Sequence, residues 1–413
     1  MTNESYYSIK LLLKCLRLEK PEKKAQALTI YTPADWENVL DAAHLHGVQP
    51  LLAWHLSRLP EQPSLPQNRY RELQHSLLNC AGRNIQRFHD LDDILSRLAK
   101  IHTPVILLKG AHLAKFVYPH AGLRPMGDLD LLIPQDRLGQ AHQALVSLGY
   151  TAKRNFSIQR ERKTHHHLPP YHRHNRIVEL HWTIASPLSP LNIDLEGVWQ
   201  RARPAPGHNP PAWLLSPEDL LLHLSLHLLQ DEFSSGIRRI YDIAQALDFY
   251  QAELDWEMLV SRAHQWGNNK GLFLILLLSA EWYNAPLPNG YLERLQPPDF
   301  TPQIEHLALQ RALSVARPSK LDLHPNVARL WRRQPLRRKV AALFHSLFPA
   351  PEIIAQKYHL QPDTPKVYWY YGVRMKDLLA QYGGQVRRLL SGDPQLHELA
   401  AQENLLSDWC LKS

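Results

Sequence analysis

The chain has 413 residues, of which 44% are hydrophobic and 21% are charged. This composition is close to the globular average and excludes a wholly disordered protein, and the length predicts two or three domains. The 47 Lys and Arg against 39 Asp and Glu give a net charge of +8. An excess of positive charge favours anionic partners such as nucleotides, nucleic acid or phosphorylated substrates.

The three cysteines, Cys15, Cys80 and Cys410, are far apart and form no CxxC pair. We therefore expect no disulfide framework and no cysteine metal site. The first ten residues lack the basic start and apolar stretch of a secretion signal. The most apolar segment, 272–280, is too short to cross a membrane. These features predict a cytoplasmic protein without a membrane span.

The first hundred residues have apolar side chains at three- and four-residue steps, which predict helices. A proline-rich linker around residues 60–66 precedes one long helix that we expect over 70–100. The predicted core face of this helix comprises Leu73, Leu77, Cys80, Ile85, Phe88, Leu91, Ile94 and Leu98.

After residue 103 the apolar pattern changes to short continuous runs, which are typical of buried strands. Strands are expected over 104–110 (PVILLKG), 128–133 (DLDLLI) and 177–184 (IVELHWTI). Short helices are expected between them, over 111–118 and 136–148.

Beyond residue 187 the helical spacing returns, with helices expected over 216–229, 236–250, 256–266, 271–282 and 302–316. The order of elements predicts an α+β fold, in which a small mixed β-sheet is flanked by N-terminal and C-terminal helical regions. The predicted division is a helical region over 1–100, an α/β domain over 101–200, a helical domain over 201–345 and an extension over 346–413.

Three acidic residues form the candidate metal site. Asp128 and Asp130 are two residues apart in a predicted strand, so their side chains project from one face about 6.6 Å apart. Enzymes with two metal ions about 3.5–4 Å apart need carboxylates at a similar separation, and Mg²⁺ suits a site with few protein carboxylates. Glu179 lies in the next predicted strand along the chain. The alternative is a pair of solvent-facing aspartates at a sheet edge.

Basic residues close to these acids could bind phosphate. Lys109-Gly110 ends one predicted strand and begins a helix, where backbone N–H groups favour an anion. Arg124 lies four residues before Asp128 and could stabilise the charge of a triphosphate.

These motifs resemble those of the DNA polymerase β-type nucleotidyltransferase superfamily, and more closely those of a bacterial group known as uncharacterised nucleotidyltransferases. The matching motifs are a KG turn at 109–110, R-P-x-x-D-x-D at 124–130, E-x-H-W at 179–182, LLLHLSLHLL at 220–229 and IRRIYDIAQAL at 237–247. The similarity extends over residues 30–380 and is strongest over 105–250. The resemblance implies that the α/β domain is the nucleotidyltransferase domain.

The resemblance also implies an enzyme that transfers NMP from an NTP, such as ATP, to an acceptor and releases pyrophosphate. It implies Mg²⁺ or Mn²⁺ bound by catalytic acids, which are Asp128, Asp130 and Glu179, and nucleotide contacts from Lys109, Gly110, Arg124, His181 and Arg238. The acceptor could be a small molecule, a protein or RNA.

One departure from the superfamily pattern leaves an alternative open. The superfamily usually has Gly-Ser at the first turn, whereas this chain has Lys109-Gly110-Ala111 and lacks the hydroxyl. The alternative is a catalytically degenerate nucleotide-binding protein, or an RNA-binding or toxin-like module that uses the basic segments.

Residues 153–176 are rich in basic and histidine side chains. The segment holds Lys153, Arg154, Arg160, Arg162, Lys163, Arg173 and Arg176 with a single acid, Glu161, and His165, His166, His167, His172 and His174. A phosphate-facing segment beside the site and a solvated surface are the two main interpretations. A zinc site is the third, but on a strand only His165 and His167 would share a face, and no Cys or acid completes the ligand set.

The remaining candidates each have a structural alternative. His181 could orient Glu179, contact phosphate or be a buried structural residue. The helical pair His223 and His227 lacks the glutamate of HExxH, so core or domain-contact histidines are expected.

Two basic groups remain. Arg238 and Asp242 could form an i,i+4 ion pair, or Arg238 and Arg239 could contact phosphate. The basic run 317–339 could bind RNA or form a solvated helix face.

Overall fold

The computed structural model describes residues 3–411 with the exception of 62, 64, 164, 188, 209–210, 231–232, 234–235, 314–326, 328–346, 350, 359 and 361–363. The chain divides into two compact units, which are Met1–Thr151 with Ile158–Val315 and Ala152–Ser157 with Ala316–Ser413. The four-part division expected from the sequence stays a prediction. The predicted basic run 317–339 lies outside the described residues except for Val327.

The first unit begins with helices that pack on one another. They are α1 (Asn3–Cys15), α2 (Pro21–Leu28), α3 (Pro33–Leu45), α4 (Gln49–Ser57) and the long α5 (Gln67–Ala99). A capping box defines the start of α3, because the Thr32 hydroxyl accepts from the Asp35 N–H while the Asp35 carboxylate accepts from the Thr32 N–H. Helix α5 covers the segment predicted as one long helix.

The predicted core face of α5 contains one error. Ile85 is 50% exposed, and the neighbouring Asn84 is buried instead. Asn84 lies four residues after the buried Cys80, and its amide donates to the carbonyl oxygens of Ala121 (2.6 Å) and Arg124 (2.8 Å). A polar side chain is favourable at this buried position because both hydrogen bonds fix a loop that passes over the helix.

The sheet at the centre of the first unit is mixed, as the α+β prediction requires. Its strands are β1 (Ile106–Leu107), β2 (Leu129–Leu132), β3 (Thr151–Ala152), β4 (Tyr171–Arg173), β5 (Arg176–His181), β6 (Arg203–Pro204) and β7 (Trp213–Leu214). Their order in the sheet is β3-β4-β5-β2-β1-β7-β6. Strand β2 pairs parallel with β5 and antiparallel with β1. All four residues of β2 are buried, which explains its three leucines and makes Asp130 a buried acid.

Short helical segments connect these strands. They are α6 (Lys109–His112), the π-helical turn η1 (Leu113–Val117), the 3₁₀ turn η2 (Gln135–Arg137), α7 (Leu138–Ser147), α8 (Ile158–Glu161) and α9 (Leu195–Arg201). Helix α7 ends before Gly149, which has a φ of 82° and therefore occupies the left-handed region that glycine tolerates.

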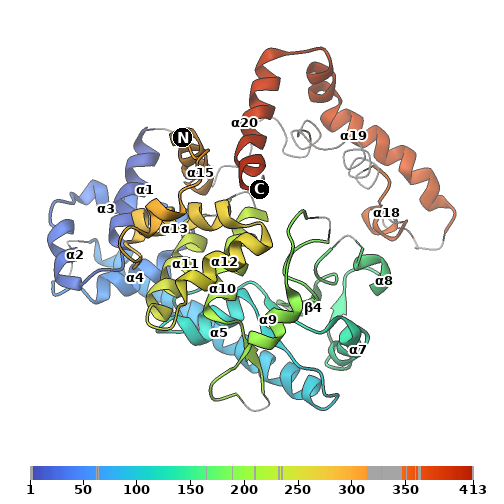
Figure 1. Ribbon diagram of the computed structural model, residues 1–413, viewed down its shortest axis with the longest axis horizontal. Helices are drawn as coiled ribbons and strands as arrows, with labels where there is room; N and C mark the ends of the chain where they lie inside the picture. Colours follow the sequence, from blue (N-terminus) through green and yellow to red (C-terminus); the bar gives the residue numbers. More distant parts are fainter. Residues whose placement is uncertain are drawn as a thin grey trace. The chain divides into compact units, whose positions relative to one another are not determined.

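A helical bundle completes the first unit. It consists of α10 (Pro217–Gln230), α11 (Gly236–Tyr250), α12 (Trp256–Trp266), α13 (Asn269–Tyr283), α14 (Tyr291–Leu295) and α15 (Pro302–Leu313). Figure 1 shows α10, α11, α12 and α13 side by side. Gly236 permits close packing of α11 on α15, because a Cβ there would lie 2.5 Å from the Cβ of Ala312. Helices α10 and α11 each present polar side chains to one cavity, described below.

In the second unit, α18 (Pro351–Lys357), α19 (Lys366–Leu390) and α20 (Pro394–Leu411) are helical. Ile354 and Ala355 pack against Val367, and Leu389 packs against Leu396 and Ala400. Within the described ranges of the whole chain, no helix combines the length and apolar character that crossing a membrane requires.

Candidate active site

Parallel pairing of β2 with β5 brings two acids together at the centre of the sheet. Asp130 lies directly opposite Glu179 in the strand register. His181 follows on the same strand, with its Nε2 atom 2.9 Å from Asp130 Oδ1 and 3.4 Å from Glu179 Oε2. One ligand atom from each of the three residues lies within 4.8 Å of the others. Two carboxylates and an imidazole at this spacing could hold a metal ion.

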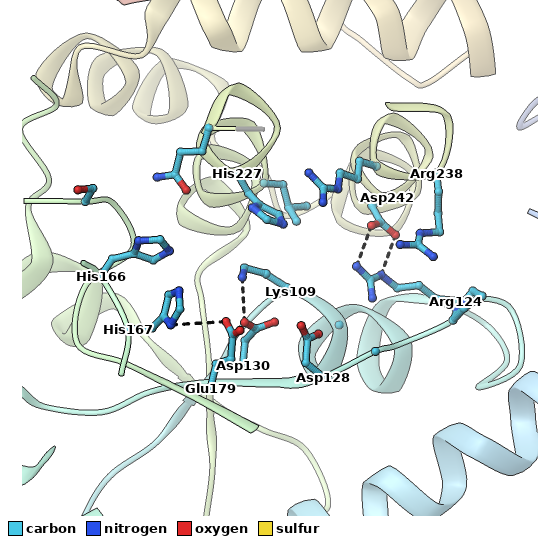
Figure 2. Close-up of a pocket in the computed structure, with 17 residues that line it drawn as sticks. Lys109, Arg124, Asp128, Asp130, His166, His167, Glu179, His227, Arg238 and Asp242 are labelled. Carbon is cyan, nitrogen blue, oxygen red and sulfur yellow. Dashed lines mark hydrogen bonds and ion pairs between the residues drawn. The ribbon is translucent and has the colours of Figure 1, made fainter. Parts of the chain in front are cut away.

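Asp128 precedes β2 and lines the same cavity as Asp130 and Glu179 (Figure 2). It is not part of the group whose ligand atoms all lie within 4.8 Å of one another. Burial raises its pKa, and the negative charges of Asp130 and Glu179 raise it further. The three carboxylates therefore repel one another, and a cation between them would relieve this repulsion.

Lys109 supplies a positive charge to this acidic group. Its Nζ atom lies 2.8 Å from Asp130 Oδ1. Burial opposes ionisation of Asp130, but Lys109 and His181 outweigh it and hold the pKa of this carboxyl well below its ordinary value. Lys109 has a φ of 39°, a left-handed conformation that is strained for a residue with a side chain. Such strain is typical of functional sites.

Gly110 allows Arg124 to approach the turn after β1. A Cβ at Gly110 would lie 2.8 Å from Arg124 Nη1 and 3.1 Å from Met126 Cγ, so any larger residue would displace these side chains. Arg124 is 9% exposed, and Asn84 fixes its backbone through the hydrogen bond described above.

Asp242 of α11 fixes the Arg124 guanidinium in a two-pronged ion pair. Arg124 Nε donates to Asp242 Oδ1 and Nη2 donates to Oδ2, both at 2.9 Å. The Tyr118 hydroxyl also donates to Asp242 Oδ1, at 2.8 Å. The ion pair of Arg238 with Asp242, which the helical spacing offered as one interpretation, is therefore wrong. Arg124, from a distant segment, takes both carboxylate oxygens.

A cavity of about 620 Å³ lies over these residues. It is lined by Lys109, Gly110, Arg124, Pro125, Gly127, Asp128, Asp130, His166, His167, Glu179, Ser186, Leu224, His227, Gln230, Arg238, Arg239 and Asp242. Figure 2 shows Arg124 and Arg238 on one side of the acids, and His166 and His167 on the other. Burial lowers the pKa of both Arg238 and Arg239, so an anion beside them would be stabilising.

The histidines that line the cavity are not the pair that the sequence predicted to share a face. His166 and His167 both line it, whereas strand geometry predicted that only His165 and His167 would share a face. The prediction was wrong because this segment forms only a single bridge, His167 to His181, and no strand. The pKa of His166 and the pKa of His227 are both lowered to about 2, mainly by burial and to a smaller extent by nearby positive charges. Both rings are therefore neutral at neutral pH.

The basic side chains of residues 153–176 do not line the cavity. Arg173 and Arg176 instead pair with Asp90 of α5, at 2.7 and 2.8 Å. His165 pairs with Glu161 at 3.3 Å. The acidic group with His181 is the one cluster of three metal-ligand residues in the described part of the chain, so the histidines of this segment form no such cluster.

Several residues of the site could not be predicted from the sequence. Asn84 holds the backbone of Arg124, and Tyr118 holds Asp242, the ion-pair partner of Arg124. Ser186 and Gln230 line the cavity. Of these four residues, Asn84 could have been recognised, because it is a polar residue at the helical spacing of a buried face. His223, predicted as a core histidine, is buried and does not line the cavity, whereas His227 does.

A comparison with family models matches residues 32–284 to the family described as "Uncharacterised nucleotidyltransferase". The matched segment is more than half of the chain and contains every residue of the cavity. No curated protein and no solved structure gave a match. The chain belongs to this nucleotidyltransferase family.

Proposed function

We propose that this member of the uncharacterised nucleotidyltransferase family transfers NMP from an NTP to an acceptor, with release of pyrophosphate, and that it depends on a divalent metal ion. The observation that carries the proposal is the meeting of Asp130 and Glu179 across β2 and β5, with Asp128 beside them in a cavity that also holds arginines. In the proposed division, segment 101–200 supplies the acids and segment 201–345 supplies Arg238 and Arg239.

The donor atoms fit Mg²⁺ or Mn²⁺. Carboxylate oxygens are the ligands that these ions prefer. Burial, and then the negative charges of Asp130 and Glu179, raise the pKa of Asp128, and a bound cation would counter both effects. Asp128, Asp130 and Glu179 would hold the metal, with His181 positioning Asp130 through its 2.9 Å hydrogen bond. When bound, the metal would neutralise charge on the reacting phosphate and promote ionisation of the acceptor.

The arginine side of the cavity suits the triphosphate. Arg124 is held in place by Asp242, and Arg238 and Arg239 lie on the turn of α11 that precedes Asp242. Fixed guanidinium groups stabilise the negative charge that develops on phosphate oxygens, at no reorganisation cost during the reaction. Lys109 would leave Asp130 when the metal binds and would then contact a phosphate oxygen.

The acceptor would enter from the histidine side. An acceptor oxygen forms a bond to the α-phosphorus, the bond from that phosphorus to the bridging oxygen of the β-phosphate breaks, and pyrophosphate leaves with that electron pair. A carboxylate of the acidic group takes the acceptor proton. Neutral His166 and His227 can donate or accept hydrogen bonds, which suits a hydroxyl-bearing acceptor.

The test is a transfer assay with α-³²P-labelled NTPs, Mg²⁺ or Mn²⁺ and a panel of small-molecule, protein and RNA acceptors. The wild-type chain is expected to label one acceptor class and to release pyrophosphate. The Asp128→Ala/Asp130→Ala double variant should lose both, whereas the exposed control Asp136→Asn should retain them. Identical product profiles for the wild type and the double variant would contradict the proposal.

A second function, nucleotide binding without turnover, is favoured by Lys109. The turn Lys109-Gly110-Ala111 lacks the hydroxyl that the superfamily usually has, and the Lys109 ammonium contacts the acid that a metal would need. In that case NTP would bind equally well with and without a chelator, and no pyrophosphate would be released. Calorimetry of NTP binding with EDTA and with Mg²⁺ separates the two functions.

A further inference from the structure

A second cavity of about 520 Å³ lies against a different face of α11. It is lined by Arg17, Leu18, Glu19, Lys20, Pro21, Lys24, Trp54, His55, Arg58, Pro119, Tyr241, Gln245 and Asp248. None of these residues lines the candidate active site. The volume is within the range of small-molecule sites, which is about 300–1,000 Å³.

Positive side chains dominate this second cavity. Arg17, Lys20, Lys24 and Arg58 face two acids, Glu19 and Asp248. Glu19 pairs with Lys23, which does not line the cavity, at 3.6 Å. Burial raises the pKa of Asp248.

The cations of the second cavity lack carboxylate partners. Among the described residues, none of the four forms an ion pair within 4.0 Å, whereas the buried Arg124 and Arg262 both do. Arg17 donates only to the backbone oxygen of Glu281, at 3.4 Å, and its Nε atom is buried without a hydrogen-bond partner. An anion would satisfy donors that the described part of the chain leaves unpaired.

Lys24 is the most unusual of these cations because it is only 2% exposed. Its Nζ atom lies 2.6 Å from His55 Nδ1, and His55 Nε2 lies 2.9 Å from the Tyr241 hydroxyl. Burial lowers the pKa of Lys24 to about 8, so the amine is mostly protonated at neutral pH. A buried ammonium group that is paired only with neutral groups is costly, and a bound anion would offset this cost.

An aromatic surface adjoins the cations. Trp54 lines the cavity, and the Arg58 guanidinium lies 5.1 Å from the centre of its ring. We propose that this cavity is a second binding site, separate from the candidate active site, for a small molecule that carries a phosphate group. Lys24, Arg17 and Arg58 bind the phosphate, and Trp54 contacts the rest of the molecule. The proposal does not depend on nucleotidyl transfer.

The test uses inorganic pyrophosphate as the probe and isothermal titration calorimetry in the presence of EDTA. The wild-type chain is expected to bind pyrophosphate at two sites. Arg58→Gln should weaken one site about tenfold or more, because a charge-assisted hydrogen bond is lost, and should leave the other unchanged. Arg238→Gln should weaken only the other site. Lys14→Gln, at an exposed position of α1 and outside both cavities, is the matched control and should change neither.

Lys24→Met repeats the test at the buried position, and circular dichroism reports whether the variant folds. If it does not fold, Arg58→Gln still decides the question, since the Arg58 side chain is exposed. The proposal is wrong if pyrophosphate does not bind, if it binds only at the site that Arg238→Gln weakens, or if Lys14→Gln weakens binding as much as Arg58→Gln.

Discussion

Lys109 places its ammonium group 2.8 Å from Asp130, which itself lies opposite Glu179 in the sheet. Without a metal, this lysine is the counter-cation of the acidic group. A divalent ion that binds Asp130 must compete with it, and the displaced lysine would then be free to contact phosphate. The same side chain therefore has two expected roles, and a variant can separate them.

Lys109→Met should bind Mn²⁺ at least as tightly as the wild type, because a competing cation is removed. It should bind NTP about 10- to 100-fold more weakly, since one charge-assisted phosphate contact is lost. Mn²⁺ titration and the KM for NTP measure the two effects. Lys115→Met, which removes a lysine paired with Asp92 outside the cavity, is the control. Weaker Mn²⁺ binding in Lys109→Met would exclude the competition.

His181→Ala should lower metal-dependent activity or metal affinity by about 10- to 100-fold, which is typical for partners that orient a metal ligand. The reason is the 2.9 Å hydrogen bond that fixes Asp130. His181→Gln, which can restore a donor near this position, should recover part of the loss. Mn²⁺ affinity and transfer rates measure both variants, with His89→Gln, on the exposed face of α5, as the control. Equal losses for the two His181 variants would argue against the positioning role.

Asp242→Ala should reduce the free energy of unfolding by about 3–5 kcal/mol, because it leaves the buried Arg124 guanidinium unpaired. Asp41→Asn is the matched control. It removes an ion pair of similar length, 2.7 Å, but with a 76% exposed carboxylate, and it should cost about 0–1 kcal/mol. Denaturant unfolding measures both. Similar values for the two variants would show that the Arg124–Asp242 pair contributes no more than a surface pair.

The stability of the chain should fall between pH 7 and pH 5, and His112 should contribute to this fall. Burial lowers the pKa of His112 from 6.5 to about 3. Below pH 6.5 the unfolded chain takes up a proton at this residue that the folded chain does not, so acid favours unfolding. The expected contribution at pH 5 is about 2 kcal/mol.

His112→Gln should remove this contribution and make the pH dependence of the unfolding free energy about 2 kcal/mol smaller between pH 7 and pH 5. Tyr250→Phe removes the hydroxyl that lies 3.2 Å from His112 Nε2 but leaves the imidazole, so it should keep the wild-type slope. Denaturant unfolding at pH 7 and pH 5 measures the three proteins. The same slope in His112→Gln and the wild type would contradict the role of His112.

The local pattern of the sequence was sufficient to predict the type and the approximate ends of many helices and strands. The helices α11 and α12 begin and end at the predicted residues, since their apolar spacing is regular and polar or turn residues flank them. The spacing of Asp128 and Asp130 also indicated carboxylates on one strand. Strand β2 begins only at Leu129, however, so Asp128 projects from the end of the loop.

Long-range relationships could not be predicted in the same way. The register that places Asp130 opposite Glu179 depends on which strands pair, and residue spacing within one segment does not contain this information. Asp242 likewise has an arginine at helical spacing on its own helix, but it pairs with Arg124, 118 residues away. The burial of Asn84 in place of Ile85 depends on a loop that needs hydrogen-bond donors.

We propose that the acidic group of Asp128, Asp130 and Glu179 binds divalent ions together with a nucleotide. Electron paramagnetic resonance of Mn²⁺ with a non-hydrolysable NTP tests it most directly. We expect two bound Mn²⁺ ions per chain, about 3.5–4 Å apart and therefore magnetically coupled, with loss of both in Asp130→Asn and retention in Asp136→Asn. If the nucleotide binds as tightly in EDTA and Asp130→Asn binds Mn²⁺ like the wild type, the acidic group is not a metal site.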